Sequence, residues 1–337
     1  MTRIPPDYFP FLIISAFGLV ALIVFWSIMD MVLLGASLAV VLLPVYHKLA
    51  GRTKPVIAAS ITTVAVFFIL AVFAAVTLLI LQANSGTLAN LFGTIGSWLT
   101  NPASNPTLFG VPLNKETFSA LFEEGQALFV NYWSTVTGNI ILIAFKAFVF
   151  FFSLFILLLH GENLKQKTFT KLPLPVKRYV DHLTPVTVDV LYAIYIVQVA
   201  IAVLTFFIAL PVFYLLGYGN IFFYSYLAAF CELIPILGSS VTFIIIGAYA
   251  YAIGDLTGVL ILFVLGYLIV SLLPEVYVRP VLVGRRVKIH PVIMFIGIIG
   301  GLLTMGLAGF VLGPLIIVLL MTSYRIWMDE RDRSTAS

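Results

Sequence analysis

Residues 231–240, CELIPILGSS, place a carboxyl group and two helix-breaking residues in the middle of an apolar run that extends from Ile221 to Gly254. An ionised carboxylate in apolar surroundings is costly unless it is protonated, paired or hydrated. Glu232 is therefore a candidate proton or sodium site. It is equally a candidate cap, because Pro235 and Gly238 interrupt a helix and free main-chain amides that can donate to a carboxylate.

Small and hydroxyl-bearing residues extend this candidate site. A second apolar run, from residue 291 to residue 324, has the sequence GGLLTMGLAG at its centre. Hydroxyl groups at such breaks either donate to a substrate or bond to carbonyls of their own helix. The substrate- or ion-binding residues expected from the two runs are Glu232, Pro235, Gly238, Ser239, Ser240, Gly300, Gly301, Thr304 and Gly306.

These residues do not form a catalytic set. Gly254-Asp255 matches half of an intramembrane aspartyl protease motif, but no second acid lies suitably within an apolar run. Gly238-Ser239-Ser240 is similar to a serine nucleophile turn, but no apolar run contains a histidine. The sequence contains no phosphate-binding loop and no metal-ligand cluster. We therefore expect no enzyme activity, no cofactor and no metal, and the single Cys231 excludes an intrachain disulfide.

The composition defines the surroundings of these residues. The chain has 337 residues, of which 62% are hydrophobic and 9% are charged. A soluble domain carries about 25% charged residues. Several windows exceed the roughly 18 uncharged residues that a membrane-spanning helix needs, among them 56–83, 256–274 and 291–324. The sequence predicts an all-α, polytopic transmembrane protein.

The basic residues predict its topology. Almost all of the 18 Lys and Arg residues lie near the N-terminus or in segments 47–55, 161–188, 275–290 and 325–337. Short loops rich in Lys and Arg remain in the cytoplasm. The loop 82–133 carries only Lys115 beside several acids and is predicted to be external. Both termini are then cytoplasmic, and the net charge of +4 reflects these loops rather than nucleic-acid binding.

Single spans are expected at 11–29, 31–46, 56–81, 134–159, 189–216 and 256–273. Runs 221–254 and 291–324 are too long for one span each: as single helices they would measure about 51 Å, against a hydrocarbon core of about 30 Å. If each run is a re-entrant hairpin of two half-length helices, all the basic loops lie on one side. Glycine and proline also occur in ordinary spans, so these residues alone do not decide between the two structures.

The two hairpins follow helices of opposite direction, which predicts an inverted repeat. Interrupted apolar segments at matching positions of two halves are typical of a transporter's midplane site. We expect a scaffold at 1–160, a cytoplasmic connection at 161–188, a transport unit at 189–324 and a tail at 325–337. Lys146, inside a span, is expected to pair with an acid or to face water in the scaffold. The external segment 112–133, with Asn114 as a helix cap, is expected to cover the pore or to contact a neighbouring subunit.

Two stretches carry a resemblance to a known family. They are IPILGSS after LGYGN, and PEVYVRPVLVGRRVKIHPVIMFIGIIGGLLTMGLAGFVLGPL. The sequence is similar to the autoinducer-2 exporter family of prokaryotic membrane proteins, closely in the second half and mainly by span arrangement in the first. The motif that carries the resemblance consists of Glu275, Pro280, Gly284, His290, Pro291, Gly300, Gly301, Gly306, Gly309, Gly313 and Pro314.

The resemblance implies a multi-pass transporter of a prokaryotic cell membrane that forms homo-oligomers. Some members export autoinducer-2, and others exchange sodium for protons. We expect export of a small organic solute by alternating access, with cation/proton antiport through Glu232 as the alternative and a passive channel or a scaffold protein as weaker ones. Membrane lipids are expected partners. The cytoplasmic loop is expected to contact lipid head groups or to act as a gate, through Glu275, Arg279, Pro280, Arg285, Arg286 and His290.

Overall fold

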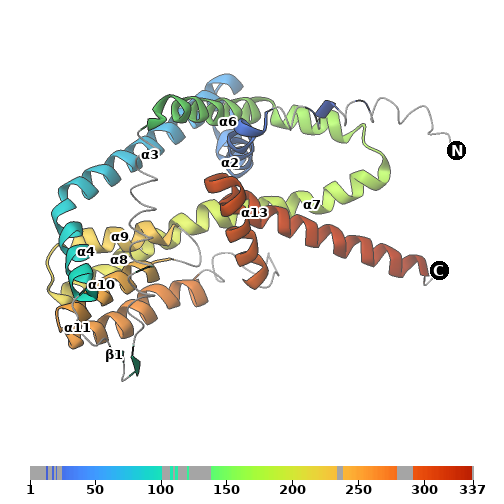
Figure 1. Ribbon diagram of the computed structural model, residues 1–337. Helices are drawn as coiled ribbons and strands as arrows, with labels where there is room; N and C mark the ends of the chain where they lie inside the picture. Colours follow the sequence, from blue (N-terminus) through green and yellow to red (C-terminus); the bar gives the residue numbers. More distant parts are fainter. Residues whose placement is uncertain are drawn as a thin grey trace. The chain divides into compact units, whose positions relative to one another are not determined.

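The computed structural model describes residues 25–100, 107–108, 111–112, 138–233, 238–278 and 291–335, together with Ile13, Phe17, Gly18, Val20 and Ala120. These residues form two compact units. Unit 1 contains residues 1–67, 141–191 and 289–337, and unit 2 contains residues 68–140 and 192–288. The ribbon is shown in Figure 1, and each unit is described by itself.

Six helices of the described part are long and apolar enough to cross a membrane. They lie at Ser27–Ala50, Pro55–Ala83, Ile140–Phe169, Val176–Leu216, Leu256–Val278 and Ala308–Met328. Three apolar helices are shorter, at Ile221–Glu232, Ser240–Ala252 and Ile296–Gly306. The prediction of an all-α, polytopic membrane protein is confirmed.

In unit 1, helices α2 (Trp26–Ala50) and α6 (Ile140–Phe169) lie side by side and run in the same direction. Near the start of α2, Ser153 Oγ donates to the main-chain oxygen of Val32 at 3.0 Å. Near its end, His47 Nε2 lies 3.1 Å from Glu162 Oε2. Between these contacts the backbones touch, because a Cβ on Gly35 would lie 2.7 Å from the carbonyl oxygen of Phe150. Two parallel neighbouring helices run across a membrane in the same direction. The spans predicted at 31–46 and 134–159 also have the same direction.

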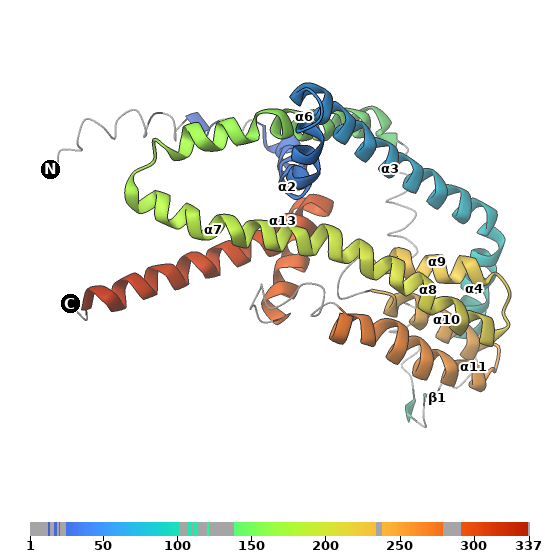
Figure 2. The same ribbon diagram turned by 180° about the vertical axis from the view of Figure 1, so that it is seen from behind.

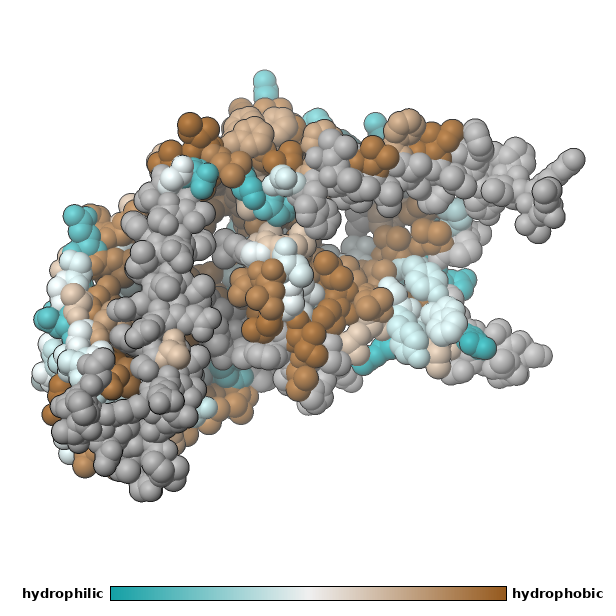
Figure 3. All heavy atoms as spheres, viewed as in Figure 1, coloured by the Kyte–Doolittle hydropathy of each residue, from teal (hydrophilic) through white to brown (hydrophobic). Residues whose placement is uncertain are grey.

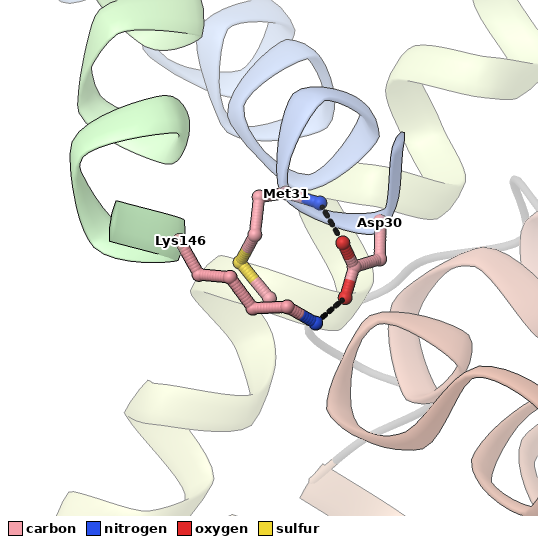
Figure 4. A network of polar contacts seen from close by, with 3 residues as sticks. All are labelled: Asp30, Met31 and Lys146. Carbon is pink, nitrogen blue, oxygen red and sulfur yellow. Dashed lines mark hydrogen bonds and ion pairs between the residues drawn. The ribbon is translucent and has the colours of Figure 1, made fainter. Parts of the chain in front are cut away.

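Lys146 finds its partner in this helix pair. Its Nζ lies 2.9 Å from Asp30 Oδ2, and the other oxygen of Asp30 accepts from the amide of Met31 at 2.8 Å (Figure 4). The predicted boundary between two spans at Asp30 is wrong, because α2 begins at Trp26 and includes Asp30. The aspartate is helical because its charge is neutralised by Lys146 of α6, so it needs no exposed loop. Residues 11–24 lie largely outside the described part.

We expect Lys146→Met to destabilise the protein by about 1–2 kcal/mol, because it leaves Asp30 charged at a site that is only 17% exposed. Thermal unfolding in detergent measures the effect. Combining it with Asp30→Leu removes the stranded charge, so the double variant should recover most of the loss. A single variant as stable as the wild type would show that the pair contributes nothing to the packing of α2 on α6.

Helix α13 (Pro291–Thr335) folds back on itself at Gly306, whose φ of 58° and ψ of −137° are not helical. The two arms touch at glycines: a Cβ on Gly301 would lie 2.0 Å from the Gly309 carbonyl oxygen, and a Cβ on Gly313 would lie 2.0 Å from the Gly297 carbonyl oxygen. Contacts 301–309 and 297–313 are those of two antiparallel arms. Re-entry into the membrane and the inverted repeat stay predictions. The second arm is longer than predicted, because the helix continues through the polar tail to Thr335.

Unit 2 is built around a second helical hairpin, α9 (Ile221–Glu232) and α10 (Ser240–Ala252). Helix α8 (Gln198–Leu216) packs on α9, and the π-helical segment η3 (Leu262–Leu272) packs on both α8 and α10. Both views of the ribbon show these elements side by side (Figures 1 and 2). The core is tightly packed. The ring centroids of Phe243 in α10 and Phe213 in α8 lie 5.5 Å apart. A Cβ on Gly266 would lie only 2.5 Å from the Phe243 ring. Arms of 12 and 13 residues are about half of a membrane-spanning helix.

A helix that the sequence analysis missed, α4 (Ser85–Thr100), covers one side of this hairpin. Leu91, Ile95 and Leu99 are buried at four-residue spacing, and the Trp98 ring lies 5.5 Å from the ring of Tyr251 in α10. Helix α4 comes directly after α3 (Pro55–Ala83). The first part of the predicted external loop therefore packs on the α9–α10 hairpin, within unit 2. The segment around Asn114 lies outside the described residues.

The remaining elements complete the described part of the chain. The predicted connection 161–188 is mostly helical, since α6 ends at Phe169 and α7 runs from Leu174 to Tyr192. The others are the strand pair β1 (Thr107–Leu108) and β2 (Val111–Pro112), the π-helical segments η2 (Ala193–Val197) and η4 (Pro274–Val278), and α11 (Leu256–Ile261). The functional division into scaffold and transport unit stays a prediction.

The outer faces of the helices are apolar. Large hydrophobic side chains of α3 and α6 are exposed, such as Ile69 at 67% and Ile141 at 84%. Figure 3 shows hydrophobic side chains over much of the described surface that it displays. Such a surface is stable next to lipid and not in water.

Candidate functional site: the tip of the α9–α10 hairpin

Glu232 is the last residue of α9, and its side chain is completely buried. Its Oε2 accepts a hydrogen bond from the main-chain amide of Ser239 at 2.8 Å. Gly238 has a φ of 49°, and a Cβ there would lie 3.0 Å from the same carboxylate oxygen. The carboxylate therefore caps the turn between the two arms, as one of the two interpretations of the sequence requires. A role for Glu232 in ion or proton binding is compatible with this cap and stays a prediction.

Two residues that the sequence analysis did not single out complete the tip. The side-chain amide of Gln198, which is 3% exposed, donates to the main-chain carbonyl of Glu232. Ser271 Oγ lies 2.9 Å from Ser239 Oγ, and both serines are buried. A polar cluster of Gln198, Glu232, Ser239 and Ser271 thus joins α8, the hairpin and η3. We call it the tip cluster.

Both partners of the hairpin lie at π-helical segments. Gln198 follows η2 directly, and Ser271 lies within η3. The π-helix is rare and is frequent at functional sites, because its wider turn redirects side chains and frees main-chain carbonyls. Neither segment has a sequence signal that periodicity detects, which explains why Gln198 and Ser271 were missed.

The other predicted site residues are only partly placed. Pro235, Arg279, Pro280, Arg285, Arg286 and His290 lie outside the described residues. Ser240 begins α10 and Glu275 lies half-buried in η4. Gly300, Gly301, Thr304 and Gly306 lie at the bend of α13, where the hydroxyl of Thr304 donates to the carbonyl of Gly300 at 2.8 Å. The α13 bend belongs to unit 1 and the tip cluster to unit 2, so the predicted meeting of the two tips stays a prediction.

The base of the α9–α10 hairpin is closed by a second polar contact. Tyr218, which precedes α9, donates from its hydroxyl to Asp255 Oδ2 at 2.6 Å. Asp255 follows α10 and also accepts from the amide of Gly258 at 2.8 Å. Because Tyr218 and Asp255 lie on either side of the hairpin in sequence, their contact shows that the chain leaves the hairpin where it entered.

The charge of Asp255 stabilises this base. The hydrogen bond from Tyr218, followed by that from Gly258, lowers the pKa of Asp255. Burial, together with the nearby Asp255, raises the pKa of Tyr218 above its usual range. A carboxyl group whose pKa is lower in the folded state stabilises the fold above its unfolded pKa of about 3.9, and this contribution is lost as the pH falls through the folded pKa.

We expect Tyr218→Phe to raise the pKa of Asp255 toward its ordinary value and to reduce stability mainly above about pH 5. Thermal unfolding from pH 7 to pH 3 compares the variant with the wild type. The two melting temperatures should approach each other as the pH falls, since protonation of Asp255 weakens the same contact in the wild type. A difference that is constant over this range would assign the effect to packing of the ring instead.

The described residues contain no group of three or more His, Cys, Asp and Glu that could hold a metal ion. A polytopic helical membrane protein with an interrupted hairpin and buried polar side chains beside the interruption has features that are typical of membrane transport proteins.

The comparison with known proteins specifies the family. The model of the AI-2E family transporters matches residues 12–329, so the chain belongs to this family. A protein of Methanocaldococcus jannaschii named "Putative transport protein" is 25% identical over 90% of this chain and 91% of its own length. A protein of the same description from Methanothermobacter thermautotrophicus is 26% identical over 88% of this chain and 87% of its own length. The resemblance noted in the sequence is confirmed.

Proposed function

We propose that this protein is a secondary active transporter that exports a small organic solute, similar to autoinducer-2, by alternating access. The observation that carries the proposal is the tip cluster, a set of buried polar groups at the break of a hairpin whose arms are about half of a membrane span. Irregular backbone at membrane depth is stable where it is buried in protein or lines a polar cavity. The hairpin tip is therefore the part of the chain best suited to meet a polar solute inside the membrane.

A second candidate function is cation/proton antiport, and a specific observation favours it. Glu232 is completely buried, and a carboxyl group inside a membrane marks an ion or proton pathway by default. The Ser239 amide donates to Oε2 of Glu232, and a carboxyl group that accepts a main-chain hydrogen bond still takes up and releases a proton. In this proposal Glu232 exchanges protons for sodium, or couples such an exchange to solute export.

Reconstitution in proteoliposomes separates these functions. Proton movement is measured under an imposed sodium gradient, and efflux of labelled autoinducer-2 is measured in parallel with and without an imposed proton or sodium gradient. Solute flux that responds to the counter-gradient supports a coupled exporter. Proton–sodium exchange without solute flux supports the antiporter. Solute flux that is indifferent to every imposed gradient would indicate a passive channel, and no flux of either kind would contradict transport.

The arrangement in the cell belongs to the same proposal. We place the protein in a prokaryotic cell membrane with both termini in the cytoplasm and as a homo-oligomer with contacts in residues 1–135. The basic loops support the orientation. A monomeric mass in mild detergent would contradict the oligomer, and accessibility of a C-terminal tag from the external side would contradict the orientation.

A further inference from the structure

Two hydroxyl groups, one in α8 and one in α9, are buried without a hydrogen-bond partner in the part of the chain that the structure describes. They are Oγ1 of Thr205 and Oγ of Ser225, and both residues are completely buried. A hydroxyl in a helix ordinarily donates to the carbonyl four residues earlier. The buried Thr62 does so at 2.9 Å, and the half-buried Thr322 does so at 2.8 Å. Thr205 and Ser225 do not use this default bond.

The two hydroxyls occupy equivalent levels of neighbouring antiparallel helices. The bond from Gln198 to the carbonyl of Glu232 sets the register of α8 against α9. Thr205 follows Gln198 by seven residues, and Ser225 precedes Glu232 by seven residues. Seven residues are almost two helical turns, so each residue lies on the same face as its reference, about 10 Å nearer the base of the hairpin. Thr205 and Ser225 therefore face the same level of the α8–α9 interface.

The chemistry of this level favours a neutral ligand. A buried hydroxyl without a partner destabilises the fold, because it has lost its hydrogen bonds to water. A buried water makes about three hydrogen bonds, and the two hydroxyls with the carbonyls at Ile201 and Ile221 are suitable groups. A bare cation would need a negative charge, and Glu232 lies too far along the helix to coordinate it.

We propose that Thr205 and Ser225 together hold a buried water molecule, and that this water lies on the route by which protons reach Glu232 from the base of the hairpin. The hydration site stands on the geometry alone. Its part in proton delivery rests on the proposed function of Glu232. Thr205 and Ser225 belong neither to the family motif nor to the tip cluster, so the proposal adds both residues to the proton route.

A double-mutant cycle in thermal unfolding tests the water site without any transport assay. Thr205→Val and Ser225→Ala each remove one hydroxyl at nearly constant shape. If one water bonds to both residues, either change releases it and lowers the melting temperature by about 2–4 °C. The double variant should then lose little more than one single variant. Losses that add, or single variants that melt at or above the wild-type temperature, would overturn the shared water.

Proton exchange in proteoliposomes tests the route. Thr205→Val is expected to slow proton exchange by about tenfold and to leave sodium affinity unchanged, because the variant removes a relay and no ligand of the cation. Normal exchange in Thr205→Val, with exchange abolished in Glu232→Gln, would overturn the route. Normal exchange in Glu232→Gln would instead refute the proposed role of Glu232, and the double-mutant cycle would still decide on the water.

Discussion

Gly309→Ala is expected to lower the melting temperature by about 10 °C or more, or to prevent folding. The added methyl group would lie 1.8 Å from the carbonyl oxygen of Gly301 on the facing arm of α13. Both groups in this clash belong to the main chain, so no change of rotamer relieves it, and the arms must separate. Overpacking commonly costs about 1–3 kcal/mol and more where the backbone has to move. Thermal unfolding and monodispersity in detergent measure the loss.

Gly300→Ala is the matched control for this prediction. The same methyl group on Gly300, next to Gly301, has no atom within 4 Å. Removing a glycine from a helix stabilises it by up to about 1 kcal/mol. The control should therefore be as stable as the wild type or slightly more so. Equal stability of both variants would show that the two arms do not meet through Gly301 and Gly309.

Glu232→Gln is expected to abolish cation-coupled proton exchange, a loss well beyond about tenfold. The amide oxygen of glutamine can still accept from the Ser239 amide, so the turn keeps its cap. The amide cannot take up or release a proton. The variant therefore separates the two roles of Glu232, and its melting temperature should remain close to that of the wild type. Exchange in proteoliposomes and thermal unfolding are measured on the same preparation.

Two further variants control this experiment. Glu232→Ala removes both the charge and the cap, so it should lose stability as well as exchange, since the Ser239 amide is left buried and unsatisfied. Ser239→Ala keeps the amide that donates to Glu232 and removes the hydroxyl beside Ser271. If Glu232→Gln exchanges protons at the wild-type rate, Glu232 is a structural cap only, and the coupled site must lie elsewhere.

The tip cluster and the base of the hairpin restrict where the hairpin can change shape. Tyr218 and Asp255 hold the base together, and Trp98 of α4 lies against Tyr251 of α10. Gln198 and Ser271 hold the tip through π-helical segments, whose hydrogen bonding is less regular than that of an α-helix. We therefore expect the tip to open before the base during transport.

The sequence by itself determined the class of protein and the position of both breaks. A long apolar run can form few structures other than membrane helices, because an unpaired main-chain group in lipid costs several kcal/mol. The bends at Gly238 and Gly306 follow from the same local chemistry, since positive φ is accessible to glycine. The family motif in the second half carried the assignment to a transporter family.

Only the tertiary structure decided which polar groups meet. Lys146 and Asp30 are more than a hundred residues apart, and no local pattern pairs them. Gln198 and Ser271 lie in helices that periodicity predicts to be uniformly apolar, and their contacts depend on π-helical turns that alter the register. Asp30 was misplaced at a boundary because its charge suggested a loop, whereas a partner on α6 makes a helical position stable. Hydrophobicity is a property of each segment alone, and the pairing of buried polar groups depends on the whole fold.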